Sequence, residues 1–225
     1  SSAQRTISFK DVTKSRWASG YRESAKVAGY INGYPDGTYK PEKDISRVES
    51  SFIITKAFNL TEKVDLYFKD LPNDPLKNDV ISKMIGSGIM NGAGYGDGTF
   101  KPDRAVTREE FAVMIARALN ESFRLDPAQG QTKMYVATST TPLNVRKGPG
   151  TSYGIIGQLP NNTEVIVHYY ENNNWAFVTA GSIKGFVSTA YLKPGPNQQP
   201  APNPTPDANP VKRYIAIDAG HGGND

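Results

Sequence analysis

The 225-residue sequence contains no cysteine and only two histidines. A disulfide framework and a thiolate metal site are therefore excluded. No apolar run reaches the roughly 18 residues of a membrane-spanning helix, so we predict no membrane span. Hydrophobic residues make up 37% of the chain, below the roughly 45–50% of a typical globular chain. Part of the sequence therefore does not belong to a folded core. The lack of cysteine fits both an exported protein without disulfides and a cytosolic one.

Positive charge is spread along the chain. The formal net charge is +4, from 26 Lys and Arg against 22 Asp and Glu. A nucleic-acid-binding surface needs a clustered basic stripe, and no segment has one. We therefore predict no nucleic-acid partner.

Proline, in contrast, is concentrated near the C-terminal end, where residues 194–210 read PGPNQQPAPNPTPDANP. This segment has no aromatic residue and no aliphatic residue larger than Ala, so it cannot bury enough apolar surface to fold. We predict a semi-rigid, polyproline-like linker over 194–212. A proline-motif ligand for another domain is the alternative, but the basic flank that would favour it is missing.

An internal repeat occupies the first half of the chain. Residues 33–59 align without a gap on residues 94–120, with 12 of 27 positions identical. The unit is about sixty residues long and occurs twice, over 8–60 and 67–121. Each copy is predicted to form a helix, a tight turn at 35–37 or 96–98, and a second helix.

The start of each second helix carries a capping box, SRVE at 46–49 and TREE at 107–110. In the second copy an apolar face then follows helical spacing. Its members are Phe111, Met114, Ile115, Ala118 and Leu119.

Arg47 and Arg108 occupy the first turn of these helices, where a cation faces the positive end of the helix dipole. A locally unfavourable charge that is present in both copies favours an anionic ligand, attracted also by the helix N-terminus, over a surface salt bridge. A calcium loop is excluded, because its first and twelfth positions would be Asn32 and Lys43, or Ala93 and Arg104.

The strings FKDV, GYPDGTYKP and SRVE or TREE, with the Trp17-Ala18 pair, resemble the S-layer homology motif twice over residues 8–120. The resemblance implies a helical, three-pronged fold that binds pyruvylated secondary polysaccharide of Gram-positive cell walls. That family usually has three repeats. The two found here imply a repeat lost upstream, a functional pair, or a homo-oligomer that completes the fold. The polysaccharide-binding residues that the resemblance implies are Trp17, Asp36, Gly37, Arg47, Asp97, Gly98 and Arg108.

Residues 132–193 are rich in Val, Ile, Tyr, Thr and Asn and have no helical period. We predict a small all-β closed barrel of six short strands over 133–137, 143–146, 155–159, 164–170, 175–179 and 184–188. The string LNVRKGPGTSYGIIGQL resembles the bacterial SH3-type domain, which implies binding of wall peptides or a spacer role. Tyr153, Trp175 and Tyr191 are groove candidates, although Trp175 is also expected as a core residue, and His168 is predicted to be structural.

The last residues, 214–225, read YIAIDAGHGGND, an apolar strand followed by a glycine-rich turn with one histidine. They resemble the opening of the zinc-dependent N-acetylmuramoyl-L-alanine amidase domain, an α/β domain truncated here to 213–225. The resemblance implies that His221 is a zinc ligand. The family's other ligands and its catalytic Glu lie further on, so no catalytic residue is expected within this sequence.

Two functions follow from these patterns. The first is the wall-anchoring portion of a secreted Gram-positive peptidoglycan amidase, with peptidoglycan and pyruvylated polysaccharide as partners and zinc as the cofactor of the complete enzyme. That enzyme would cleave the muramoyl–L-Ala amide, and this chain alone would be inactive. The second is a non-catalytic binding or structural module of an S-layer-associated protein.

Overall fold

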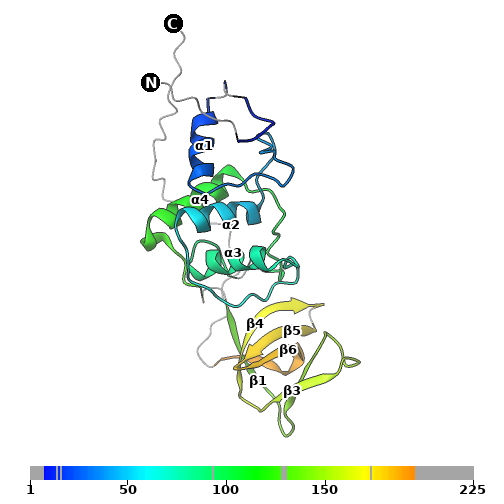
Figure 1. Cartoon of the computed structure of the whole chain (residues 1–225). Helices are drawn as coiled ribbons and strands as arrows, with labels where there is room; N and C mark the ends of the chain where they lie inside the picture. The colour runs from blue at the N-terminus through cyan, green and yellow to red at the C-terminus, as the bar shows by residue number, and fades with distance from the viewer. Residues whose placement is uncertain are drawn as a thin grey trace.

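The computed structural model describes residues 8–195, apart from positions 14, 16, 93, 128–130 and 173. Four helices form the first part of the chain and a β module follows them (Figure 1). The predicted linker beyond residue 195 and the predicted start of an amidase domain at 213–225 lie outside the described residues. No helix of the described part is long and apolar enough to cross a membrane.

Each repeat contributes two helices. Repeat one holds α1 (Ser19–Val27) and α2 (Arg47–Ala57), and repeat two holds α3 (Pro75–Gly86) and α4 (Arg108–Leu119), followed by a short 3-10 turn at Glu121–Phe123. Helix α2 packs against α3, so the second helix of one repeat is covered by the first helix of the next. The helix-turn-helix pattern predicted for each copy is present.

The two predicted capping boxes are confirmed. The Ser46 hydroxyl accepts the Glu49 N–H at 3.2 Å, and the Ser46 N–H donates to the Glu49 carboxylate at 2.8 Å. Thr107 and Glu110 make the same pair of bonds at 3.1 and 3.0 Å. These bonds satisfy N–H groups that a helix start otherwise leaves unpaired.

One apolar core joins the two repeats. Ile54 of α2, Met84 of α3 and Met114 of α4 meet in it, and all three are buried. The predicted apolar face of α4 is correct for Met114 and Ala118, which are buried, and for Phe111 and Ile115, which pack partly buried against the core. It is wrong for Leu119, which is 72% exposed. Leu119 is the last residue of α4, and the chain becomes extended at Asn120, so no further turn of helix covers it.

The β module contains seven strands: β1 (Thr132–Val136), β2 (Leu143–Arg146), β3 (Ile155–Leu159), β4 (Glu164–Glu171), β5 (Trp175–Ala180), β6 (Ile183–Ser188) and β7 (Leu192–Pro194). They form one antiparallel sheet in the order β3-β2-β6-β5-β4-β1-β7 around a core of valines and leucines. The prediction missed β7, a three-residue strand. Among the described residues no pairing joins β3 to β7, so the sheet order does not confirm a closed ladder.

Repeat two and the β module touch. The Tyr67 ring lies 4.2 Å from the His168 ring, centroid to centroid. The Lys69 ammonium is 3.1 Å from the Glu171 carboxylate, and it lies over the Tyr169 ring at 5.1 Å. Strand β4 accordingly lies on the side of the module that faces the helices (Figure 1).

The capping box of α2 supports a stability prediction. Ser46→Ala should lower the free energy of unfolding by about 1 kcal/mol, because the Glu49 N–H loses its acceptor. Urea unfolding followed by circular dichroism measures the change. The control Ser152→Ala removes an exposed hydroxyl in the β module and should change stability by less than about 0.5 kcal/mol. Equal effects of the two substitutions would contradict the capping role.

Candidate functional site

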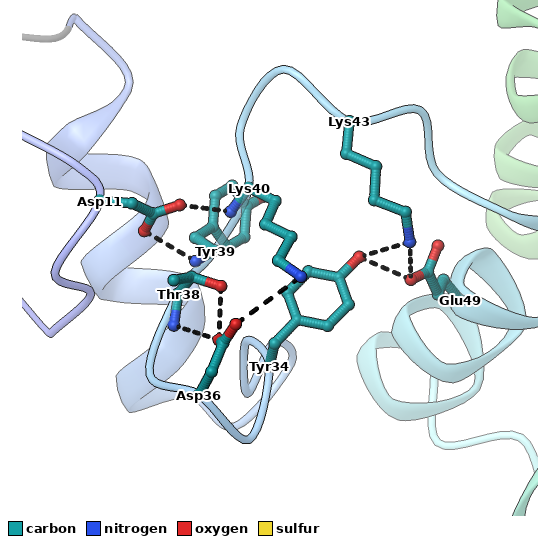
Figure 2. A network of polar contacts seen from close by, with 8 residues as sticks. All are labelled: Asp11, Tyr34, Asp36, Thr38, Tyr39, Lys40, Lys43 and Glu49. Carbon is teal, nitrogen blue, oxygen red and sulfur yellow. Dashed lines mark hydrogen bonds and ion pairs between the residues drawn. The ribbon is translucent and has the colours of Figure 1, made fainter.

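The turn between the two helices has the same construction in both repeats. In repeat one the Asp36 carboxylate accepts the Thr38 N–H at 2.9 Å and the Thr38 hydroxyl at 2.6 Å (Figure 2). Gly37 follows with a φ of +80°, which only glycine adopts without strain. Asp97, Gly98 and Thr99 repeat this arrangement, with a φ of +79° at Gly98. Each aspartate therefore builds its own turn.

A second carboxylate holds each turn from outside. The two oxygens of Asp11 accept the N–H groups of Tyr39 at 2.8 Å and Lys40 at 2.7 Å (Figure 2). In repeat two, Asp70 accepts from Phe100 and Lys101, both at 2.7 Å. Charged acceptors make strong hydrogen bonds, so these contacts fix the position of the backbone after the turn.

A tyrosine and a cation sit beside each turn. The Tyr34 hydroxyl donates to Glu49 at 2.8 Å, and the Lys43 ammonium bonds both that hydroxyl at 2.9 Å and Glu49 at 3.2 Å (Figure 2). These residues line a cavity of about 380 Å³ in repeat one. In repeat two, Arg104 takes the place of Lys43, bonding the Tyr95 hydroxyl at 2.6 Å and pairing with Glu110.

Arg47 lies between the two repeats. Its Nε donates to the Phe100 carbonyl at 3.0 Å, and its guanidinium lies over the Tyr95 ring at 5.1 Å and the Phe100 ring at 4.6 Å. The residue is only 9% exposed, and burial lowers the pKa of its guanidinium. An arginine nevertheless stays charged at neutral pH. No carboxylate within the described residues forms an ion pair with it.

A groove of about 350 Å³ opens at Arg47 and is called the Arg47 groove below. It contains two cations and an aromatic ring beside two glutamates. Its polar and aromatic lining residues are Arg47, Asn91, Tyr95, Glu109, Glu110 and Arg117.

The structure does not gather the sequence-predicted residues into one place. Of the seven, only Arg47 lines the Arg47 groove. Trp17 is 88% exposed and touches Tyr21 edge-on, with ring centroids 6.5 Å apart. Arg108 is exposed at the start of α4. The turn of repeat one, with Asp36 and Gly37, lies apart from the turn of repeat two, whose Gly98 packs on Tyr169 of the β module.

Sequence reasoning missed Tyr34, Tyr95 and the pair of cations at 43 and 104. A signal existed, because the Gly-Tyr dipeptide and the downstream cation occur at matching places in both copies. The sequence does not show that the cation bonds the tyrosine, because the two residues are nine positions apart and only the folded turn brings them together.

In the β module, Trp175 and Tyr191 line a cavity of about 730 Å³, together with Arg146, while Tyr153 packs near Gly148 and Gly150 instead. His168 bonds Thr179 at 3.0 Å, and burial lowers its pKa to about 4. Within the described ranges no group of three His, Asp or Glu side chains is placed to hold a metal ion. His221, the predicted zinc ligand, lies outside them.

Comparison with known proteins assigns these parts to families. Residues 8–49 and 67–112 match the S-layer homology domain, and residues 141–193 match the bacterial SH3 domain. The chain carries both domain types. The helical repeats are therefore S-layer homology (SLH) repeats and the β module is an SH3 domain.

Several curated relatives match part of the chain. The chain is 38% identical over 117 residues to S-layer protein EA1 of Bacillus anthracis, a match that covers 50% of this chain and 13% of that protein. It is 32% identical over 104 residues to the cellulosome-anchoring protein of Acetivibrio thermocellus, covering 44% and 23%. A third relative, named an uncharacterized cell wall amidase of Bacillus anthracis, is 34% identical over 120 residues, covering 51% and 21%.

The chain thus spans less than a quarter of the length of each of these three relatives. The SLH repeats and the S-layer relatives indicate a cell-surface location.

Glu49 gives a pH prediction. Although partial burial opposes ionisation, hydrogen bonds from Ser46, Tyr34 and Lys43 lower the pKa of Glu49 to about 2. Because this pKa lies below the usual value of 4.5, Glu49 stabilises the fold above about pH 4.5, and that stabilisation is lost as the pH falls towards 2. NMR titration of the carboxyl should give a midpoint near 2, and Lys43→Met should raise it. A midpoint at the ordinary value would contradict the network.

Proposed function

We propose that the SLH repeats anchor the protein to the cell surface by binding an acidic secondary cell-wall polysaccharide, of the pyruvylated kind, in the Arg47 groove. The observation that carries this proposal is a buried guanidinium that forms no direct ion pair among the described residues, because Glu110 and Asp70 act on it only at longer range. A carboxylate on the polymer would supply a direct partner through a charge-assisted hydrogen bond. The neighbouring Tyr95 ring lines the same groove and is 39% exposed, with the cations of Arg47, Lys101 and Arg104 lying over it.

The other predicted residues enter the proposal with different roles. Trp17 and Arg108 are exposed, and each is available to a long polymer. The Asp36–Gly37 and Asp97–Gly98 pairs keep the turns in shape, so their contribution to binding is positional. The relative named a cellulosome-anchoring protein supports an anchoring role for this chain.

Binding to cell walls tests this proposal. Arg47→Lys keeps the charge but loses the planar hydrogen-bonding group, so it should weaken co-sedimentation with Gram-positive walls roughly 10-fold or more. Arg108→Ala should weaken it as well. The control Lys56→Ala removes an exposed cation from α2 and should bind like the wild type.

Walls stripped of the pyruvylated polymer provide the second control and should retain much less of the wild-type chain than intact walls, with only the proposed contact of the SH3 domain to peptidoglycan left. If the wild-type chain sediments equally with stripped and intact walls, another wall component is the ligand and the proposal fails.

We further propose that the anchor belongs to a peptidoglycan hydrolase, a zinc-dependent N-acetylmuramoyl-L-alanine amidase. The relative named a cell wall amidase and the YIAIDAGHGGND string at 214–225 support this proposal. His221 would be the one zinc ligand that this sequence offers. Bound zinc would polarise the amide carbonyl and lower the pKa of a water molecule. The alternative is a non-catalytic surface module, which the S-layer relatives favour.

The division into two SLH units at 8–60 and 67–121, an SH3 unit at 132–193, a linker and an amidase start at 213–225 is part of the same proposal. Peptidoglycan is the proposed partner of the SH3 cavity at Trp175 and Tyr191. We also predict that copies of this chain associate into a homo-oligomer that completes the helical unit. Analytical ultracentrifugation would measure the mass of that oligomer.

The catalytic part of the proposal predicts an inactive chain. Residues 1–225 with added zinc should release no peptides from peptidoglycan, because one histidine cannot by itself form a catalytic zinc site. A free-amine assay on purified peptidoglycan measures the outcome, because cleavage of the muramoyl–L-Ala amide frees the amino group of L-Ala; an active amidase is the positive control. Turnover above the zinc-only background would be incompatible with this assignment.

A further inference from the structure

The SH3 domain touches the same turn that holds Arg47. On one side of the turn, the Phe100 carbonyl accepts the Arg47 side chain. On the other side, a Cβ atom built on Gly98 would lie 2.6 Å from Cγ and 2.7 Å from Cβ of Tyr169. Only one residue, Thr99, therefore separates the residue that contacts Arg47 from the residue that contacts the SH3 domain.

Two adjacent residues link these contacts. The Lys69 N–H donates to the Gly98 carbonyl at 2.8 Å, and the Lys69 ammonium pairs with Glu171 of the SH3 domain. Its neighbour Asp70 accepts the Phe100 N–H at 2.7 Å. Lys69 and Asp70 therefore hold the backbone at residues 98 and 100, while the Lys69 ammonium is held by Glu171 of the SH3 domain.

The SH3 side of the contact has a specific construction. The pairing of β4 with β5 shifts register between Val167 and Tyr169. Such a bulge re-aims side chains, and here His168 packs on Tyr67 while Tyr169 packs on Gly98. The Tyr169 ring is stacked on Phe177, with centroids 5.3 Å apart and planes 5° apart, and Phe177 contacts Phe186 at 5.2 Å. The rings of Phe177 and Phe186 therefore support the Tyr169 ring, which contacts the turn of repeat two.

Repeat one shows what the turn is like without this support. Gly37 has nearly the same φ as Gly98, but the nearest atom to a Cβ built there is Cε of Lys10, at 3.3 Å. The local hydrogen bonds of the two turns are the same. Among the described residues, only the turn of repeat two contacts the SH3 domain, and its Phe100 carbonyl is the group that Arg47 binds.

We propose that the SH3 domain is a support for the polysaccharide groove, with Tyr169 and Glu171 as positioning residues that fix the repeat-two turn and, through Phe100, Arg47. This inference rests on the proposed function of the Arg47 groove. Because coupling between two sites is reciprocal, polymer bound in the groove also strengthens the docking of the SH3 domain.

The test uses the whole 225-residue chain with three tyrosine variants. Tyr169→Ala should lower the affinity for soluble pyruvylated wall polysaccharide, measured by calorimetry, roughly 5-fold or more. Tyr169→Phe keeps the ring and should bind like the wild type. Tyr170→Ala removes an exposed tyrosine from the next position of β4 and should also bind normally. Equal affinity of Tyr169→Ala and wild type would overturn the proposal.

Hydrogen exchange gives a readout that does not depend on the polymer. Tyr169→Ala should speed amide exchange in 95–101 several-fold, and unchanged exchange there would also overturn the proposal. Gly98→Ala should speed exchange in 164–171, whereas Gly37→Ala, with the same backbone strain, should not. If wild type shows no polymer binding while these exchange results hold, the proposed ligand is wrong and the support of the turn stands.

Discussion

The hydrogen bonds that carboxylates make to the backbone of the repeat-two turn are the constraint on which the rest of the described structure depends. Asp97 closes the turn from inside and Asp70 holds it from outside. The fixed backbone then presents the Phe100 carbonyl to Arg47 and the Gly98 surface to Tyr169. One short segment therefore joins repeat one, repeat two and the SH3 domain.

Comparing the two repeats shows how the surrounding residues change the chemistry of the same turn. Both turns have the same aspartates, glycine and threonine, and both have a tyrosine with a cation beside it. They differ in what surrounds them. The cavity beside Tyr34 is lined by residues of repeat one alone. The Arg47 groove, in contrast, combines an arginine from repeat one with Tyr95 of repeat two. Two similar turns thus have different surroundings, because the Arg47 groove is built from residues of both repeats.

Local features were predictable because each depends on few neighbouring residues. A hydroxyl and a glutamate three positions later are enough for a capping box, and both boxes formed as expected. Short segments rich in Val, Ile and Tyr located six strands, while β7 was missed because three residues carry no recognisable period. Leu119 was misassigned for a similar reason: helical spacing says which face a residue shares, but it cannot say where the covering partner ends.

The sequence by itself determined the two repeats, their turns and caps, the β module, and the resemblances that point to a cell-surface anchor. It also marked Arg47 and Arg108 as a matched pair of cations at helix starts. Only the tertiary structure decided that they differ, because the side chain of Arg47 is buried against the next repeat while that of Arg108 remains exposed. Burial and ion pairing depend on which units pack together, and that packing is a property of long-range contacts rather than of any local pattern.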